Sequence, residues 1–204
     1  MKRLSLADSK ILSILLLLAL CLCLCACRTT AGTDHDQIVR SAIDLAGSYI
    51  KLSRYEDALS VYDRALEQAN DYRLYYNKAI VLSNLGRNME AAQICGESFE
   101  QFPHIIKLKT AQAHYLRLAG ATSDSYNAYQ HVLELNPYDR DTRMLYIDYL
   151  IEDGQKQIAY EQALIMWDQG YRDEKTIGYL YTLQPNSWQN VYKLIVGEKS
   201  STEQ

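Results

Sequence analysis

The chain has 204 residues, of which 21 are Lys or Arg and 25 are Asp or Glu, so its formal net charge at pH 7 is −4. This length suits one domain with a continuous core, and 48% hydrophobic residues are enough to build it. The negative balance argues against a nucleic-acid partner, which would require a basic face.

The N-terminus has the pattern of an export signal. Lys2, Arg3 and Lys10 are followed by an apolar run, and residues 11–26 carry no charge. That run is shorter than the roughly 20 residues that a transmembrane helix needs. A basic segment before a short apolar segment is typical of a secretory signal peptide, which we expect over residues 1–26.

The signal ends in the sequence Leu-Cys-Ala-Cys at residues 24–27, which resembles a bacterial lipobox. The resemblance implies that Cys27 becomes the lipid-bearing first residue of the mature chain. No other cofactor is expected. The alternatives are a plain secretory signal with incidental cysteines or an uncleaved anchor. The other cysteines of the segment fit less well because leucine precedes each of them where a small residue is wanted: Cys21, Cys23 and Cys25.

Cysteine usage is simple once the signal is removed. Four of the five cysteines lie in it or at its end, which leaves Cys95 as the only free thiol of the mature chain. No intrachain disulfide can then form. Cys95 stands beside Ile94 in an apolar helical pattern, which predicts a buried and unreactive side chain.

Residues 27–38 are predicted to form a flexible tether. The segment 28–36 is short, polar and without hydrophobic periodicity, so it would hold the following domain close to a membrane. Its acidic and histidine residues at 34–36 could touch a metal ion, but a solvated stretch is the simpler interpretation. Arg28 stands where an aspartate favours retention in the inner membrane of many bacteria. The resemblance to lipoproteins therefore implies an outer-membrane location facing the periplasm.

A turn residue and a small residue recur through the rest of the chain, five positions apart, at intervals of 33 or 34 residues. Pro103 and Pro137 keep the same period where a helix must end. Glycine permits a left-handed turn, and a small side chain lets two helices approach closely, so the period predicts stacked helix–turn–helix units. The turn residues are Ser53, Gly86, Gly120 and Gly154, and the small residues are Ala58, Ala91, Ser125 and Ala159.

This pattern resembles the tetratricopeptide repeat (TPR) family. The resemblance implies an all-α fold, a right-handed α-solenoid of about four TPR-like repeats over residues 39–170. The repeats are expected at residues 39–71, 72–105, 106–139 and 140–170. Beyond the turn and small residues, the matching positions include Tyr49, Tyr55 and Tyr62 in the first copy, Tyr75-Tyr76-Asn77 and Phe99 in the second, Ala113, Tyr129 and Leu133 in the third, and Leu150 in the fourth.

Residues 171–204 are predicted to close the array with a capping helix pair and a frayed tail. Residues 173–183 can form one helix, and Ser187 can cap a second one after a proline-containing break. An open stack leaves an unmated apolar end that such a pair covers. The alternative is that Trp188 and Tyr192 form an exposed docking patch. The apolar face expected on the second helix is made of Trp188, Val191, Tyr192, Leu194 and Ile195.

In TPR proteins the partner lies in a groove lined by the first helix of each repeat. Arg40, Arg73 and Lys107 occupy the same position in three successive repeats, which would form a row of cations for a carboxylate or an acidic segment. The alternative is that each base is solvated or pairs with a nearby acid. The resemblance implies a partner-binding groove formed by Arg40, Ile43, Arg73, Tyr76, Asn77, Ile80, Lys107, His114, Arg117 and Met144.

Family members that bind C-terminal carboxylates use a clamp of lysines, arginines and asparagines. Asn77 and Lys107 match two of its positions, but Asp44 stands where an asparagine is expected and Ala111 where an arginine is expected. The clamp is incomplete, which argues against recognition of a C-terminal carboxylate.

No catalytic constellation is recognisable in the sequence. The four histidines are not paired at metal-ligand spacing, and there is no nucleophile elbow, phosphate-binding glycine loop or Cys–His pair at a known spacing. We therefore predict a binding protein rather than an enzyme, without a metal site.

These features predict a membrane-anchored scaffold that presents a TPR groove to a protein or peptide partner in the bacterial cell envelope. It would be an accessory lipoprotein of an assembly, secretion or pilus machine. Two alternatives stand beside this prediction. One is a periplasmic transporter-associated subunit or small-ligand-binding lipoprotein, and the other is a surface lipoprotein with a structural or adhesive role.

The lipid anchor can be tested directly. Intact-mass spectrometry of the protein purified from membranes is expected to show a chain that begins at Cys27 and carries acyl groups. Cys27→Ser should abolish the acyl mass and release the protein from the membrane fraction. A mature wild-type chain without acyl mass would rule out the lipoprotein prediction.

Overall fold

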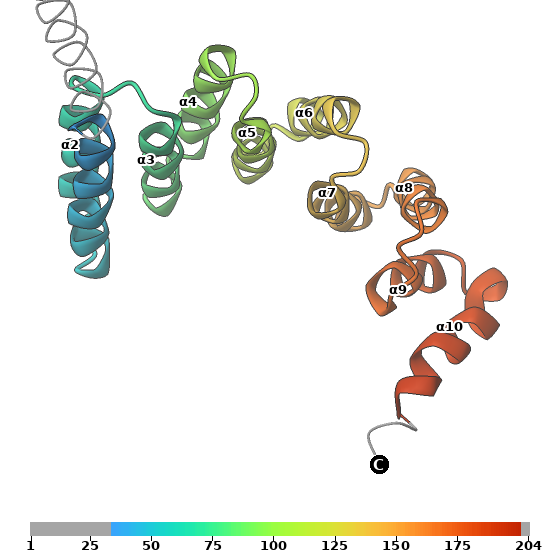
Figure 1. The fold of residues 1–204 in the computed structure, drawn as a ribbon. Coiled ribbons are helices and arrows are strands. Elements are labelled where there is room, and N and C mark those ends of the chain that lie inside the picture. Colours follow the sequence, from blue (N-terminus) through green and yellow to red (C-terminus); the bar gives the residue numbers. More distant parts are fainter. Residues whose placement is uncertain (1–33, 201–204) are drawn as a thin grey trace, which may run out of the picture. The chain divides into compact units, whose positions relative to one another are not determined.

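A computed structural model describes residues 34–200, which form helices joined by short turns (Figure 1). The signal peptide and Cys27 lie outside these residues. The chain forms two compact units, unit 1 ending at Arg87 and unit 2 beginning at Asn88, and each is considered by itself. Unit 1 holds the N-terminal helix, described over residues 34–51, with α2 (Tyr55–Leu66) and α3 (Tyr72–Asn84). Unit 2 holds α4 (Asn88–Gln101), α5 (Ile106–Leu118), α6 (Thr122–Leu135), α7 (Arg140–Glu152), α8 (Lys156–Asp168), α9 (Glu174–Leu183) and α10 (Pro185–Ser200).

The helix bounds follow the predicted period. Helices α3, α5 and α7 begin where the second, third and fourth repeats were expected to begin. In unit 2, Figure 1 shows α5, α7 and α9 along one side and α4, α6 and α8 along the other. Among residues 34–200 no helix has the length and apolar character required to cross a bilayer.

Every predicted turn residue adopts the left-handed conformation. The backbone φ is 57° at Ser53 and between 73° and 80° at Gly86, Gly120 and Gly154. In each case the next residue donates its backbone N–H to the carbonyl five positions back, as Arg54 does to Tyr49 at 2.9 Å. This is the Schellman arrangement, which ends a helix sharply and satisfies its last carbonyls. The same arrangement ends α8 at Gly170, which lies between two helix pairs and outside the period of 33 or 34 residues, and the sequence analysis did not predict it.

The predicted small residues are completely buried. Ala58, Ala91, Ser125 and Ala159 are all 0% exposed, as close helix packing requires. Serine is tolerated at one of these positions because the Ser125 hydroxyl donates to the Ala113 carbonyl at 2.8 Å, which leaves no buried donor unpaired.

Aspartates initiate three of the first helices. The side chains of Asp71, Asp139 and Asp173 each accept a backbone N–H of the first turn of α3, α7 and α9. Such N-caps are worth about 1 kcal/mol each. Asp139 and Asp173 are one repeat apart, so α9 starts in register with the preceding array. The equivalent position before α5 is Ile105, which offers no side-chain cap.

The C-terminal pair caps the core of unit 2. Trp188 is half-buried, its ring lies 5.0 Å from that of Trp167, and its Nε1 donates to the Tyr160 hydroxyl at 3.1 Å. These contacts confirm the capping prediction. They also engage Trp188 with the core, so it does not form an exposed docking patch. The α10 side chains that pack against the core are Trp188, Val191, Tyr192, Ile195 and Val196.

Three predictions of local structure are wrong. Residues 34–38 are helical rather than part of a tether, because Asp36 and His35 make contacts with the start of α3 that hold them in the N-terminal helix. Leu194 is 60% exposed and does not belong to the apolar face of α10. That helix begins at Pro185 rather than after Ser187, because proline is favourable at a first helical position.

One buried cation escaped the sequence analysis. Arg143 of α7 is only 4% exposed, and its guanidinium donates to the Pro137 carbonyl at 2.7 Å and to Gln162 of α8. Burial lowers the pKa of Arg143, and the nearby charge of Asp139 offsets this only in part. Through these two hydrogen bonds the Arg143 side chain links the α6–α7 turn to α8.

The strain at Ser53 gives a test of the turn. Ser53→Gly should stabilise the protein by about 1 kcal/mol, because glycine adopts a positive φ without the penalty of a Cβ. Gly86→Ser, at the matched position of the next turn, should destabilise by a similar amount. Chemical denaturation monitored by circular dichroism measures both changes. Changes of the same sign in the two variants would contradict the assigned turn geometry.

Candidate functional site

The predicted cations of unit 1 are paired internally. Arg73 contacts Asp36 at 2.8 Å and Asp71 at 2.9 Å, and Arg40 contacts Asp36 at 2.5 Å. One carboxylate of the N-terminal helix therefore serves both arginines. The alternative interpretation, that these bases pair with nearby acids, is the one found for Arg40 and Arg73. Lys107 belongs to unit 2, so its alignment with them stays a prediction.

Asp71 is the centre of this polar cluster. Burial by itself would raise the pKa of its carboxyl, but hydrogen bonds from the Arg73 side chain and backbone and from His35 lower it to about 2. His35 Nε2 lies 3.3 Å from Asp71 Oδ2. Asp71 thus caps α3 and joins that helix to the N-terminal helix. Arg73 therefore has a structural role, because its guanidinium is bonded to Asp36 and Asp71 within unit 1.

The other predicted groove residues of unit 1 are half-buried on their helices. Ile43 lies on the N-terminal helix, and Tyr76, Asn77 and Ile80 lie on α3. The Asn77 side chain donates to the Arg73 carbonyl of its own helix at 2.7 Å. In this position its amide is engaged with the backbone, which further weakens the resemblance to a carboxylate clamp.

In unit 2 two of the predicted residues, His114 and Arg117, belong to one polar cluster between α5 and α7. His114 Nδ1 lies 2.8 Å from the Tyr149 hydroxyl, and the two rings stack at 6.2 Å. The Arg117 guanidinium lies 5.1 Å from the centre of the Tyr149 ring and is held by Asp153 at 2.7 Å and Glu152 at 3.2 Å. Both ends of the Tyr149 side chain are therefore fixed by the preceding repeat.

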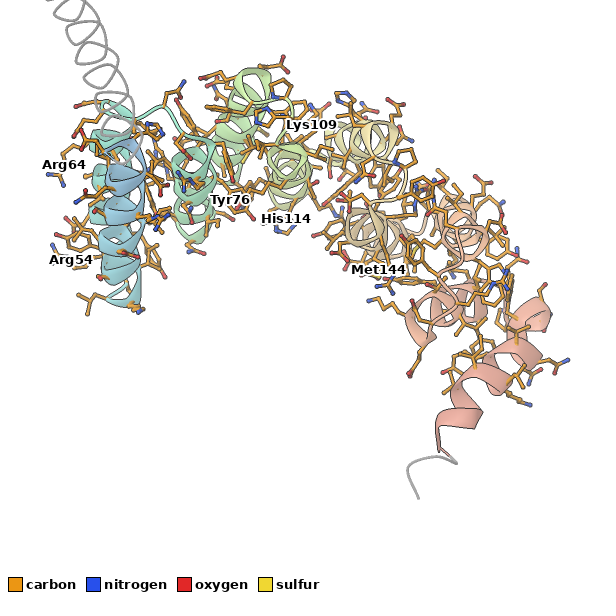
Figure 2. The ribbon with its side chains drawn as sticks, in the orientation of Figure 1. Arg54, Arg64, Tyr76, Lys109, His114 and Met144 are labelled. Atoms are coloured by element: carbon orange, nitrogen blue, oxygen red, sulfur yellow. The ribbon has the colours of Figure 1, made fainter. Side chains whose placement is uncertain are left out.

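Figure 2 shows His114 of α5 and Met144 of α7 on the same side of unit 2, with Lys109 on the opposite side of α5. We call this side, formed by α5, α7 and α9, the first-helix face. Positions three or four residues apart share one side of a helix. The exposed or half-buried residues of this face are therefore His114, Arg117 and Leu118 on α5, Met144, Leu145, Asp148 and Ile151 on α7, and Lys175 and Gly178 on α9.

Apolar side chains stand exposed on this face. Leu118 is 49% exposed and Leu145 is 38% exposed. Met144 and Ile151 are half-buried and pack against the core beneath them. The face thus combines exposed aliphatic groups with fixed polar groups, which is the composition of a protein-binding surface.

A hollow of about 590 Å³ lies beside α9, and one residue of α7 and one of α10 also line it. Its lining residues are Ile151, Glu174, Lys175, Gly178, Tyr179, Thr182 and Tyr192. None of the residues of α9 and α10 that line it was among the predicted site residues. The sequence analysis placed the groove on the four repeats and favoured a capping role for the last helix pair, although its alternative named Tyr192 as part of a docking patch.

Catalytic chemistry has little support among the described residues. Within residues 34–200 no group of three or more His, Cys, Asp and Glu side chains is placed to hold a metal ion. Cys95 is completely buried, and that burial raises the pKa of its thiol to about 12, so it stays protonated and unreactive.

Comparison with known proteins places this geometry. No protein-family model and no curated protein sequence matches the chain. Several solved structures, in contrast, match the chain. A TPR protein from Parabacteroides merdae has a TM-score of 0.63 at 14% identity, covering 80% of this chain and 68% of its own. The protein MamA has a TM-score of 0.58 at 10% identity, covering 79% and 88%. YrrB, described as a TPR protein with an unusual peptide-binding site, has a TM-score of 0.52 at 19% identity, covering 72% and 76%.

The chain has the TPR fold. At these identities the likeness concerns the fold alone, and the partner of each neighbour does not transfer. The TPR assignment agrees with the positive-φ turn residues and the buried small residues found here. It also identifies α5, α7 and α9 as first helices of their pairs, whose exposed side forms the first-helix face.

The His114 contact gives a pH-dependent prediction. Burial lowers the pKa of His114 below its ordinary value of 6.5, so the folded state binds fewer protons there than the unfolded state. The free energy of unfolding should therefore fall as the pH drops through about 6.5.

His114→Asn places an amide near the Nδ1 position and removes this titration. The drop in Tm between about pH 7.5 and about pH 5.5 should be smaller in the variant than in the wild type. Thermal unfolding at the two pH values measures the difference. An equal drop in both proteins would show that protonation of His114 does not oppose folding.

Proposed function

We propose that this protein is a lipid-anchored interaction scaffold of the bacterial cell envelope, which binds a protein or peptide partner on its first-helix face. Its lipid would sit on Cys27, and its place would be the periplasmic side of the outer membrane. An accessory role in an envelope assembly, secretion or pilus machine fits this arrangement.

The observation that carries the proposal is the pair of exposed leucines on the first-helix face. The small residues, turns and ion pairs of the described repeats all serve the packing of the helices. Leu118 and Leu145 instead keep 49% and 38% of their surface exposed. Exposed apolar side chains rimmed by polar groups favour a protein partner.

The proposal is tested by cross-linking in native membranes followed by purification and mass spectrometry. Leu118→Glu combined with Leu145→Glu should reduce recovery of the specific partner at least about tenfold, because it places charge in an apolar contact. Leu135→Glu is the matched control, since Leu135 is 48% exposed but lies on the second helix α6.

The control variant should recover the partner at the wild-type level. Undiminished recovery by the double variant, with its Tm unchanged, would refute binding on the first-helix face. Equal losses in the double variant and in Leu135→Glu would also contradict it, because the effect would then not be confined to that face.

A further inference from the structure

A polar hollow of about 310 Å³ lies between α5 and α6. Lys109, which lines it, lies on the side of α5 opposite to His114 (Figure 2). The hollow is therefore separate from the first-helix face. Its lining consists of Lys109, Gln112 and Leu116 of α5 and Asp124, Asn127, Ala128 and His131 of α6.

The polar side chains around this hollow are not engaged within the part of the chain that the structure describes. Lys109 and His131 contact only an aromatic ring. The side chains of Asp124 and Asn127 make neither a hydrogen bond nor an ion pair with residues 34–200. On the first-helix face, in contrast, His114 already has a protein partner. The hollow thus gathers polar groups that are available to a ligand.

The carboxamide of Gln112 occupies a place that only glycine on the neighbouring helix permits. A Cβ on Gly96, in the interior of α4, would lie 2.4 Å from Gln112 Nε2. Glycine in a helix destabilises it relative to alanine, yet Gln112 Oε1 is buried here without a hydrogen-bond donor. An unpaired buried acceptor requires an explanation. The terminal amide turns easily about its last bond, so a ligand in the hollow can supply the missing partner.

The bases and the acid stand at opposite ends of the hollow. Helices joined by a short turn run antiparallel, so residues far from the turn at Gly120 lie together. Lys109 and His131 are far from that turn, and both contact the Phe99 ring, at 5.7 Å and 6.2 Å. Asp124 lies in the first turn of α6, close to Gly120. It is separated from His131 by about 10 Å along the helix.

This arrangement is complementary to a short peptide with free ends. A chain of two or three residues spans about 7–10 Å, whereas a single amino acid carries both charges on one carbon. The peptide carboxylate complements Lys109 and His131, and the ammonium group complements Asp124. Between the two ends, the amides of Gln112 and Asn127 can each donate to and accept from a peptide group.

We propose that this hollow binds a free peptide of two or three residues, with its C-terminus at Lys109 and its N-terminus at Asp124. The volume of about 310 Å³ lies at the lower end of the range of ligand sites, which suits a ligand of this size. The inference goes beyond the proposed function, because it assigns a different ligand to a different side of α5.

Isothermal titration calorimetry of the full-length protein with alanine, dialanine and trialanine tests the ligand. Dialanine or trialanine should bind with a Kd below about 1 mM. Alanine should bind at least about tenfold more weakly, because its charges cannot reach both ends of the hollow. Acetylation of the amino end or amidation of the carboxyl end of the better peptide should also weaken binding at least about tenfold. These comparisons do not depend on the folding of any variant.

Two charge-removing variants test the place and direction of the peptide. Lys109→Gln should weaken the uncapped peptide at least about tenfold and leave the affinity for the amidated peptide unchanged, because the charge pair is then already absent. Asp124→Asn should do the same for the acetylated peptide. Lys156→Gln is the matched control, since Lys156 is an exposed lysine of α8 outside the lining, and it should keep the Kd within about twofold.

Several results would overturn the proposal. Equal binding of the free and capped peptides would show that the terminal charges are not recognised. Unchanged affinity in both charge variants would place the peptide elsewhere on the protein. If neither peptide binds the wild-type protein, this site is refuted, while the proposed partner on the first-helix face is unaffected.

Discussion

Close packing of neighbouring helices at a completely buried small side chain is the constraint on which the rest of this structure depends. Ala58, Ser125 and Ala159 leave room for a neighbouring helix, and a larger side chain at any of these positions would hold the axes apart. The left-handed residue five positions earlier directs the chain so that this small residue arrives at the contact. Turn and contact together determine the direction of each helix, and so which side chains remain outside.

Polar pairs between successive repeats determine how the helices of one repeat align with those of the next. In unit 2, Thr110 faces Thr142, His114 faces Tyr149, Arg140 binds Asp173 and Tyr179 binds Asp148, each across roughly one repeat. These bonds engage, within the protein, side chains that the sequence alone suggests as binding residues. The arginines of unit 1 show the same effect, because a cation held by one or two carboxylates attracts an acidic ligand far less than an isolated cation does.

The surface that remains for a partner therefore combines exposed leucines with polar side chains that already have partners. Leu118 and Leu145 are exposed on the first-helix face, and the hollow beside α9 includes Tyr179 and Tyr192 in its lining. The capping pair has two roles in this view. It covers the last core residues of unit 2, and its Tyr192 completes a recess that the repeats alone would not form.

The sequence was enough to predict the all-α fold and the repeat boundaries from residue 72 to residue 140. It was also enough to predict the positive φ at four turns and the burial of Cys95. Each of these is a local or periodic property. Glycine adopts the left-handed conformation of the turn, and the period of 34 residues locates each small residue at which two helices pack closely. The partners of Arg40, Arg73 and His114 could not be predicted, because they lie on another helix and depend on side-chain direction. A useful signal existed, since complementary residues recur about one repeat apart, but periodicity alone does not say which of several acids or hydroxyls comes within reach. The helical start at residues 34–38 and the hollow beside α9 were likewise decided by tertiary structure. The first depends on contacts with α3, and the second depends on where α10 places Tyr192.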